Sequence, residues 1–149
     1  MTNEKIKRMF DACYQAKRIR EMLPPLPPGV MPSYIQYLDV IRKLEGQGTG
    51  VKVSDISDAL NIPRPGVTRT VKEMEKKGYL TKYASEEDGR ITYVFITEKG
   101  EELSDKYDKN YYSRLLKYMD HISEEEADCM ISTIEKFYKV MSERRVDIE

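Results

Sequence analysis

The chain has few of the residues on which catalytic and metal sites depend. Its 149 residues include one histidine, two cysteines and no tryptophan. Cys13 and Cys129 lie far apart without metal-ligand spacing, so the sequence predicts no bound metal. His121 is expected in a turn with no nucleophile near it in sequence, and no glycine-rich phosphate loop occurs. We therefore expect neither enzymatic activity nor a cofactor.

Long apolar runs are also missing. No stretch approaches the roughly 18 apolar residues of a membrane span. The first residues contain no apolar export signal with a cleavage site. The sequence therefore predicts neither a membrane span nor export, and we expect a cytoplasmic protein with reduced thiols.

Charge is balanced overall but unevenly distributed. Lysine and arginine total 25 and aspartate and glutamate 26, so the sum does not indicate a nucleic-acid-binding protein. Residues 1–50 carry 8 basic and 5 acidic groups, residues 51–100 carry 9 and 8, and residues 101–149 carry 8 and 13. DNA would repel the acidic third of the chain, so a basic binding surface is expected in the middle.

Residues 53–78 have the pattern of two short helices joined by a tight turn. Ser54 can cap the first helix, which is expected to end near Asn61. The prolines at positions 63 and 65 suit only the approach and first turn of a helix. The second helix is therefore predicted to begin at Arg64 or Pro65 and to run to Lys77.

The second helix has an apolar stripe and a basic face. Val67, Val71 and Met74 recur at helical spacing and require a core to cover them. Between positions 63 and 78, five basic residues stand against two acidic ones. A short positive helix of this kind fits the major groove of duplex DNA. The side chains expected to contact DNA are Arg64, Thr68, Arg69, Lys72 and Lys76.

A hairpin is predicted directly after this helix. Leu80 to Tyr83 and Ile91 to Ile96 are rich in β-branched and aromatic residues, and a polar segment that contains a glycine separates them. Arg90 stands at the end of that turn, where it can enter the narrow minor groove, and Asp88 is close enough to orient it. Val51 to Val53 could add a short third strand.

Four short segments follow one another in the chain. They are Thr68-Arg69, Met74-Glu75-Lys76-Lys77-Gly78, Asp88-Gly89-Arg90 and Ile96-Thr97-Glu98-Lys99-Gly100. In this order they resemble the MarR family of bacterial transcription regulators. The resemblance implies a winged helix-turn-helix, mainly α with a small β wing, that binds double-stranded DNA. One departure is Pro65-Gly66, where the family usually has small hydroxyl residues.

The helices expected on either side have wide apolar faces. We predict helices from about Asn3 to Met22, from a capping box at Ser33, from Thr97 to about Met119, and from Ser123 through Met141, with a proline-rich connector over residues 24–32. A chain this short cannot hide all these faces, so pairing with a second copy is expected. We assign residues 1–32 and 101–149 to a helical dimerisation region and residues 33–100 to the winged DNA-binding module.

The resemblance implies that two winged modules lie side by side in a homodimer. The first helix and the last two would interleave across a two-fold axis. The two recognition helices would then meet successive major grooves about 34 Å apart on a pseudo-palindromic site.

Eleven tyrosines are many for a chain of this length. The resemblance implies that some of them line a crevice for a small aromatic or phenolic effector between the pairing helices and the winged module. The candidates are Tyr14, Tyr34, Tyr37, Tyr107 and Tyr111. The alternative is that these rings only pack in the core and at an interface.

Cys13 lies in the predicted first helix. This position is similar to that of the peroxide-sensing branch of the family, where an amino-terminal cysteine is oxidised near tyrosines, here expected to be Tyr34 and Tyr37. The alternative is a small apolar residue that packs between helices.

Three hypotheses about function follow from these patterns. The leading one is a homodimeric, ligand-responsive DNA-binding regulator that acts as a repressor. The second is a thiol-based redox sensor that acts through Cys13. The third is a winged-helix module that binds proteins and not DNA, which has no reason to keep the basic helix and the Asp88-Gly89-Arg90 wing.

Overall fold

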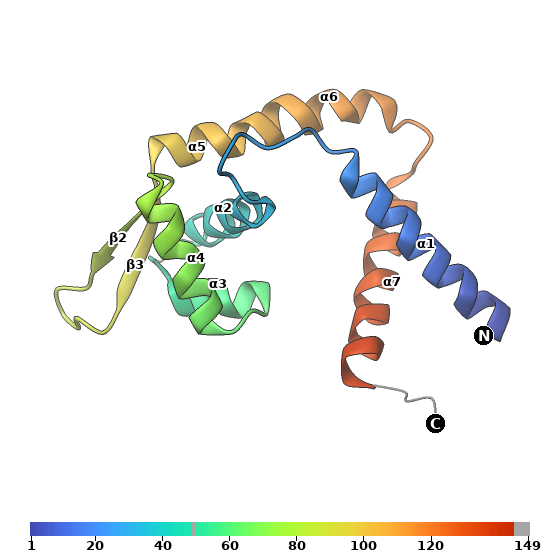
Figure 1. The fold of residues 1–149 in the computed structure, drawn as a ribbon, viewed down its shortest axis with the longest axis horizontal. Coiled ribbons are helices and arrows are strands. Elements are labelled where there is room, and N and C mark those ends of the chain that lie inside the picture. The colour runs from blue at the N-terminus through green and yellow to red at the C-terminus, as the bar shows by residue number, and fades with distance from the viewer. Residues whose placement is uncertain (49, 145–149) are drawn as a thin grey trace.

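The computed structural model describes residues 1–48 and 50–144, and it has a winged module at one end and a helical pair at the other (Figure 1). A long helix joins the two ends, and the N-terminus lies with the helical pair (Figure 1). The elements in chain order are α1 (Asn3–Glu21), α2 (Pro32–Glu45), β1 (Val51–Lys52), α3 (Val53–Leu60), α4 (Arg64–Lys76), β2 (Leu80–Ala84), β3 (Thr92–Ile96), α5 (Glu98–Asp105), η1 (Lys106–Tyr112), α6 (Ser113–Leu115), η2 (Leu116–Tyr118) and α7 (Glu124–Glu143).

The predicted helix-turn-helix is confirmed. Asn61 adopts the left-handed conformation at the end of α3, with φ of 51°, and Pro63 caps α4. Gly78 ends the turn after α4 with φ of 84°, which glycine adopts at no steric cost. The chain is therefore reversed tightly on both sides of α4, which fixes that helix between α3 and the wing.

Two predicted helix starts are wrong. The capping box at Ser33 does not form, because Pro32 already occupies the first helical position and Met31 is the cap. Ser54 does not cap α3 either. The cap is Lys52, whose backbone N–H donates to the Asp55 carboxylate at 2.8 Å. Both serines therefore lie inside the first turn of their helices.

The wing is part of a three-stranded antiparallel sheet of order β1-β3-β2. Val51 pairs with Val94 in one ladder, and Leu80 pairs with Ile96 in the other. The short third strand predicted at Val51 is confirmed, although Val53 already belongs to α3. This pairing brings the start of α3 to the base of the wing.

A single apolar core holds the winged module together. The predicted stripe of Val67, Val71 and Met74 on α4 is buried there, together with side chains of α2, α3 and the sheet. The buried apolar residues are Val30, Tyr34, Tyr37, Leu38, Ile41, Val51, Ile56, Val67, Val71, Met74, Tyr79, Leu80, Val94, Leu103 and Tyr107. Burial of one face of α4 leaves its basic face outside.

The long helix after the wing differs from the prediction of one regular helix. Thr97 caps it as expected, because its hydroxyl accepts from the Gly100 N–H at 3.2 Å. After α5, however, the seven residues of η1 form a π-helix, and α6 and the 3-10 turn η2 follow. The helix therefore changes register where it leaves the winged module.

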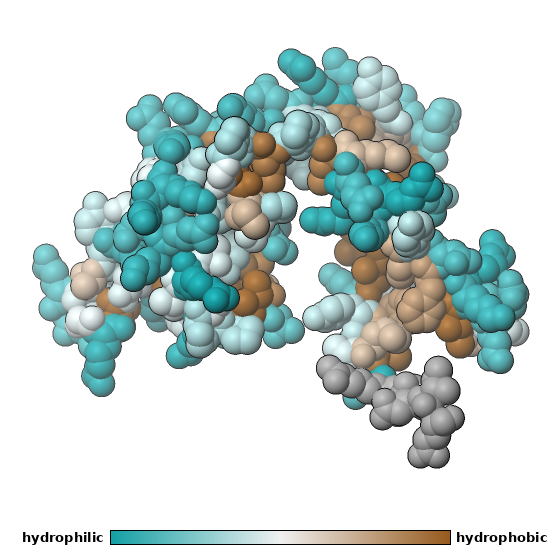
Figure 2. All heavy atoms as spheres, viewed as in Figure 1, coloured by the Kyte–Doolittle hydropathy of each residue, from teal (hydrophilic) through white to brown (hydrophobic). Residues whose placement is uncertain are grey.

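α1 and α7 lie outside that core, and neither contains a buried residue. They contact each other through the rings of Phe10 and Phe137, whose centroids are 5.2 Å apart. Apolar side chains remain exposed on both helices, and Figure 2 shows hydrophobic surface gathered over this end of the molecule. Ser123 and Glu126 form the predicted start of α7 as a capping box. The terminal pairing region was predicted to reach residue 149, and residues 145–149 lie outside the described residues.

None of the helices within residues 1–48 and 50–144 has both the length and the apolar character required to cross a bilayer.

Candidate nucleic-acid interface

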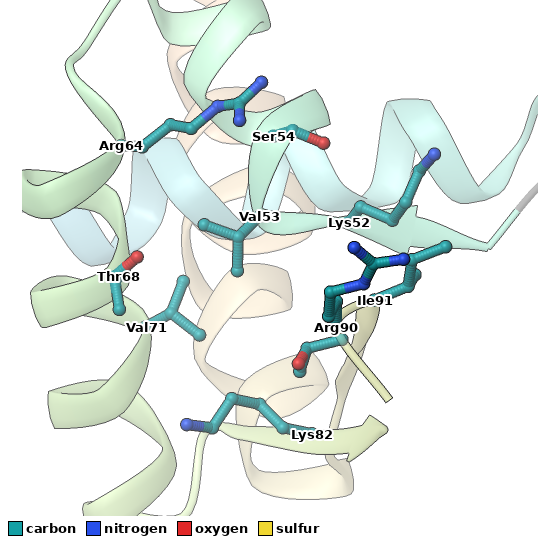
Figure 3. A pocket seen from close by; sticks show the side chains of 10 residues that line it. Lys52, Val53, Ser54, Arg64, Thr68, Val71, Lys82, Arg90 and Ile91 are labelled. Carbon is teal, nitrogen blue, oxygen red and sulfur yellow. The ribbon is translucent and has the colours of Figure 1, made fainter. Parts of the chain in front are cut away.

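A cleft of about 410 Å³ separates the exposed face of α4 from the base of the wing (Figure 3). Its walls come from five elements and from the turn of the wing, because the sheet order brings β1, β2 and β3 together beside α3 and α4. The lining residues are Lys52, Val53, Ser54, Arg64, Thr68, Val71, Lys82, Arg90, Ile91 and Thr92.

Four cationic side chains contribute to this cleft. Lys52, Arg64 and Arg90 surround the mouth, and Lys82 points inward from β2 toward α4 (Figure 3). Among them, Lys82 pairs with Glu75 of α4 at 3.4 Å. The lining contains hydroxyl groups but no carboxylate. The cleft is therefore a basic surface with an apolar floor, suited to a polyanion.

The wing places Arg90 at its tip in a defined geometry. One oxygen of Asp88 accepts the Arg90 backbone N–H at 3.0 Å and the Arg90 Nε–H at 3.2 Å. The Arg90 side chain is otherwise 92% exposed. Asp88 therefore directs a solvent-facing guanidinium without burying it.

The sequence-predicted contact residues fall into three groups. Arg64, Thr68 and Arg90 line the cleft. Asp88 holds Arg90 from within the wing. The remaining three, Arg69, Lys72 and Lys76, are exposed on α4 and do not line the cleft.

Lys77 is one of the five basic residues between positions 63 and 78, but it does not line the cleft. Its ammonium donates to the Gly29 carbonyl at 2.7 Å, to the Tyr34 hydroxyl at 2.9 Å and to Glu73 at 3.0 Å. The Tyr34 hydroxyl in turn donates to Glu73 at 2.5 Å. Lys77 therefore ties the end of α4 to α2 and to the proline-rich connector.

This cluster perturbs the acidity of its members. Burial raises the pKa of Tyr34, and its hydrogen bond to Glu73 adds to that shift. The hydrogen bonds from Tyr34 and then Lys77 lower the pKa of Glu73. The bonds to Tyr34 and then Glu73 raise the pKa of Lys77. The carboxylate of Glu73 and the ammonium of Lys77 are therefore favoured over their neutral forms.

Sequence reasoning missed Lys52, Ser54 and Lys82 as parts of the basic surface. Lys52 and Lys82 lie on the two outer strands, and only the tertiary arrangement brings both into the lining of the cleft. The third strand predicted at Val51 could have indicated Lys52, because a strand there places the next residue at the base of the wing.

The tyrosines predicted for an effector pocket have different environments. Tyr34, Tyr37 and Tyr107 belong to the core of the winged module. Tyr111 is half-buried and packs edge-on against Tyr112. Tyr14 is 65% exposed on α1. In the described chain, three of these five rings are therefore packing residues.

Cys13 lies in a separate apolar groove of about 430 Å³ between α1 and α7. Its neighbours in the lining come from these two helices and include Met9, Met130 and Phe137. The tyrosines expected beside Cys13 lie in the core of the winged module instead. In the described part of the chain, no cluster of histidine, cysteine or carboxylate side chains is arranged to hold a metal ion.

Comparisons with known proteins agree with this architecture. Residues 29–91 match the model of the MarR family. An uncharacterised HTH-type transcriptional regulator of Bacillus subtilis, YdgJ, is 30% identical over 84 residues, which are 56% of this chain and 51% of that protein. The chain thus spans about half the length of that relative.

Two solved structures share the fold. Streptococcus pneumoniae FabT in complex with DNA has a TM-score of 0.67 and 21% identity, over 95% of this chain and 99% of that one. Bordetella bronchiseptica BpsR, whose DNA binding is regulated by 6-hydroxynicotinic acid, has a TM-score of 0.65 and 13% identity, over 90% and 98%. These similarities confirm the mainly helical winged fold.

Proposed function

We propose that this chain, which belongs to the MarR family, is a homodimeric transcriptional regulator that binds a pseudo-palindromic site in duplex DNA. The observation that carries the proposal is the basic cleft between α4 and the wing, with four cations and no carboxylate in its lining. A solved structure of the same fold, FabT, is itself a complex with DNA.

The exposed face of α4 would enter the major groove. Arg64, Thr68 and Arg69 would reach base edges there, and Lys72 and Lys76 would contact phosphates farther along the helix. Arg90 would enter the minor groove beside it. The backbone strand between the two grooves would then lie over the cleft, where Lys52 would neutralise a phosphate.

The dimer would form through α1, α7 and the end of the long helix. These segments expose apolar side chains that the winged module does not cover. A two-fold pair would bury them and would place two copies of α4 on successive major grooves. A dimer bound in this way would exclude RNA polymerase from an overlapping promoter, so we propose repression as the direction of control.

Ligand responsiveness is a further part of the proposal. Its support is the half-buried Tyr111 on the long helix, which is outside the core of the winged module, and the related fold of BpsR, whose DNA binding is regulated by 6-hydroxynicotinic acid. A small aromatic or phenolic effector would bind between the winged module and the pairing helices and release DNA.

The test of DNA binding is the replacement Arg90→Ala. The substitution removes one minor-groove cation from each copy and therefore two from the dimer. It should weaken binding about tenfold across unrelated duplexes and reduce the slope of log affinity against log salt by about two. Fluorescence anisotropy with labelled duplexes over a salt series measures both quantities. By contrast, Arg64→Ala should change which sequences are preferred.

Lys43→Ala is the matched control, because it removes one positive charge from an exposed position of α2 that does not line the cleft. It should leave affinity and salt slope unchanged. If Arg90→Ala behaved like Lys43→Ala, the role of the wing would be refuted. If the wild-type protein showed no salt-sensitive binding to any duplex pool, the protein-interaction alternative would replace DNA binding.

A further inference from the structure

The joint between the winged module and the long helix is built around one arginine. Arg42, in the last turn of α2, points to successive turns of the helix that leaves the wing. Its Nε donates to Glu101 at 3.0 Å, and a terminal nitrogen donates to Asp105 at 2.8 Å. The other terminal nitrogen reaches Asp108 at 3.2 Å. One side chain thus spans the whole of the α5-to-η1 junction.

The contact is specific to the geometry of a guanidinium. All three nitrogens of Arg42 are in use, and one of them also donates to the Glu101 backbone carbonyl at 3.4 Å. A lysine ammonium is a single point of charge and cannot reach three carboxylates on separate turns in this way. Bidentate and charge-assisted contacts of this kind fix orientation as well as adding energy.

The electrostatics of the joint agree with this geometry. Burial opposes the charge on Arg42, but the hydrogen bonds that it donates to Glu101 and Asp105 more than compensate and raise its pKa. Lys109 and then Arg42 lower the pKa of Asp105. Burial and then the charge of Asp108 raise the pKa of the neighbouring Asp39. Carboxylates therefore outnumber cations here, and without Arg42 they would repel one another.

The position of the joint gives it a consequence for the dimer. The position of every element after Asp108, including α7, depends on the direction in which the long helix leaves α2 (Figure 1). A small rotation at the joint would be amplified along the helix to the pairing end. The same rotation in both copies would move the two α4 helices relative to each other.

We infer that Arg42 is a positioning residue that fixes the direction of the long helix and thereby the separation of the two recognition helices on DNA. This inference rests on the proposed function, because it assigns a role within a DNA-binding dimer. Arg42 touches no DNA in this assignment. It acts through α5 and sets which half-site spacing the dimer accepts.

The first experiment measures the separation directly. In a Cys13→Ser/Cys129→Ser background, Glu87→Cys provides one spin-label site at the exposed wing tip of each copy. Double electron–electron resonance should give a narrow distance distribution for Arg42 and a broad one for Arg42→Gln, with Arg42→Lys between them. Lys43→Gln removes the same charge from the neighbouring exposed position and should keep the narrow distribution.

The second experiment measures the spacing preference. A duplex selected from a random pool by the wild-type protein is compared with the same duplex after insertion of a single base pair between half-sites. One inserted pair moves the far half-site by about 3.4 Å and rotates it by about 35°. If only about a tenth of Arg42→Gln dimers keep the half-site spacing of the selected duplex, affinity for that duplex falls about tenfold. The inserted base pair should then reduce the affinity of the variant less than it reduces that of the wild-type protein.

The outcomes separate this inference from the proposed function. If Arg42→Gln kept both the narrow distribution and the wild-type penalty for insertion, the inference would be overturned. If the wild-type protein bound no duplex, the proposed function would fail, and the distance distributions would still test the joint. Should Arg42→Gln not fold, Asp105→Ala/Asp108→Ala retains Arg42 and removes two of its acceptors, with the same broadening expected.

Discussion

At the residue scale, the buried hydroxyl of Tyr34 connects two charged groups on α4 to the body of the module. Tyr34 is only 1% exposed. Tyr34→Phe removes the donor to Glu73 and the acceptor for Lys77. We expect the free energy of unfolding to fall by about 1 kcal/mol, measured by urea denaturation followed by circular dichroism.

Tyr37→Phe is the control for this substitution. Tyr37 lies one turn farther along α2 and is 2% exposed. Its hydroxyl takes no part in the hydrogen bonds among Tyr34, Glu73 and Lys77. Its removal should change the free energy of unfolding by less than about 0.5 kcal/mol. Equal losses in the two variants would show that the Tyr34 hydroxyl contributes nothing beyond packing.

Individual functional residues differ in how far the sequence predicts them. Asp88 and Arg90 are two positions apart, so their contact follows from local turn geometry. Lys77 could only be counted as one more positive charge of α4. Its partner Tyr34 is 43 residues away, and Arg42 is 59 residues from Glu101. Contacts at such separations depend on packing that no local pattern reports.

At the scale of elements, the first turn of α5 lies directly against the start of β2. A Cβ at Gly100 would lie 2.7 Å from Cγ2 of Ile96 and would overlap the Tyr79 carbonyl oxygen. Gly100→Ala should therefore push α5 away from the sheet and lower the free energy of unfolding by about 1–3 kcal/mol. Thermal unfolding followed by circular dichroism measures this change.

The wing glycine offers a comparison for this variant. A Cβ at Gly89 would meet no atom within 4 Å, and its backbone is not left-handed. Gly89→Ala should leave the melting temperature unchanged. A Gly100→Ala protein as stable as Gly89→Ala would mean that α5 can move away from the sheet without loss of stability. That result would contradict close packing between Gly100 and Tyr79.

Helices were predictable as elements, but their exact starts and their regularity were not. The serines at 33 and 54 are good caps in isolation, yet the observed caps, Met31 and Lys52, lie two residues earlier. Pro32 suits the first helical position, and Asp55 accepts the Lys52 N–H, so both earlier starts are favoured. The π-helix of η1 has no sequence signature of its own. It lies where Arg42 holds Asp108, so a tertiary contact accompanies the change of register.

At the scale of the whole molecule, the apolar surface of α1 and α7 determines the expected assembly. Ile131 of α7 is 57% exposed, although it is strongly apolar. In a dimer through this helix, Ile131→Glu would bury a carboxylate without a partner. We expect the variant to be a monomer in sedimentation equilibrium at concentrations where the wild-type protein is a dimer.

Lys136→Glu provides the matched comparison. It introduces the same carboxylate at an exposed polar position of α7. It should retain the dimer mass. An Ile131→Glu protein that remains a dimer would place the interface elsewhere on the molecule.

The architecture was predictable to different degrees at its two ends. The winged module follows from motifs that are adjacent in sequence, and its core stripe at Val67, Val71 and Met74 was identified correctly. The terminal helices were predicted as helices, but their arrangement against each other rests on a contact between Phe10 and Phe137. An apolar face predicts that a helix packs against another surface, but it does not identify that surface. The sequence therefore could not specify this arrangement.

The π-helical η1 also sets a rotational phase between the two ends of the protein. Each residue of an α-helix turns the chain by about 100°, so an extra residue in a helical turn changes the direction in which all later side chains point. Relatives that lack this turn would present a different face of the following helix to a partner copy. Two such chains could share the same reading surface and still be unable to form mixed dimers.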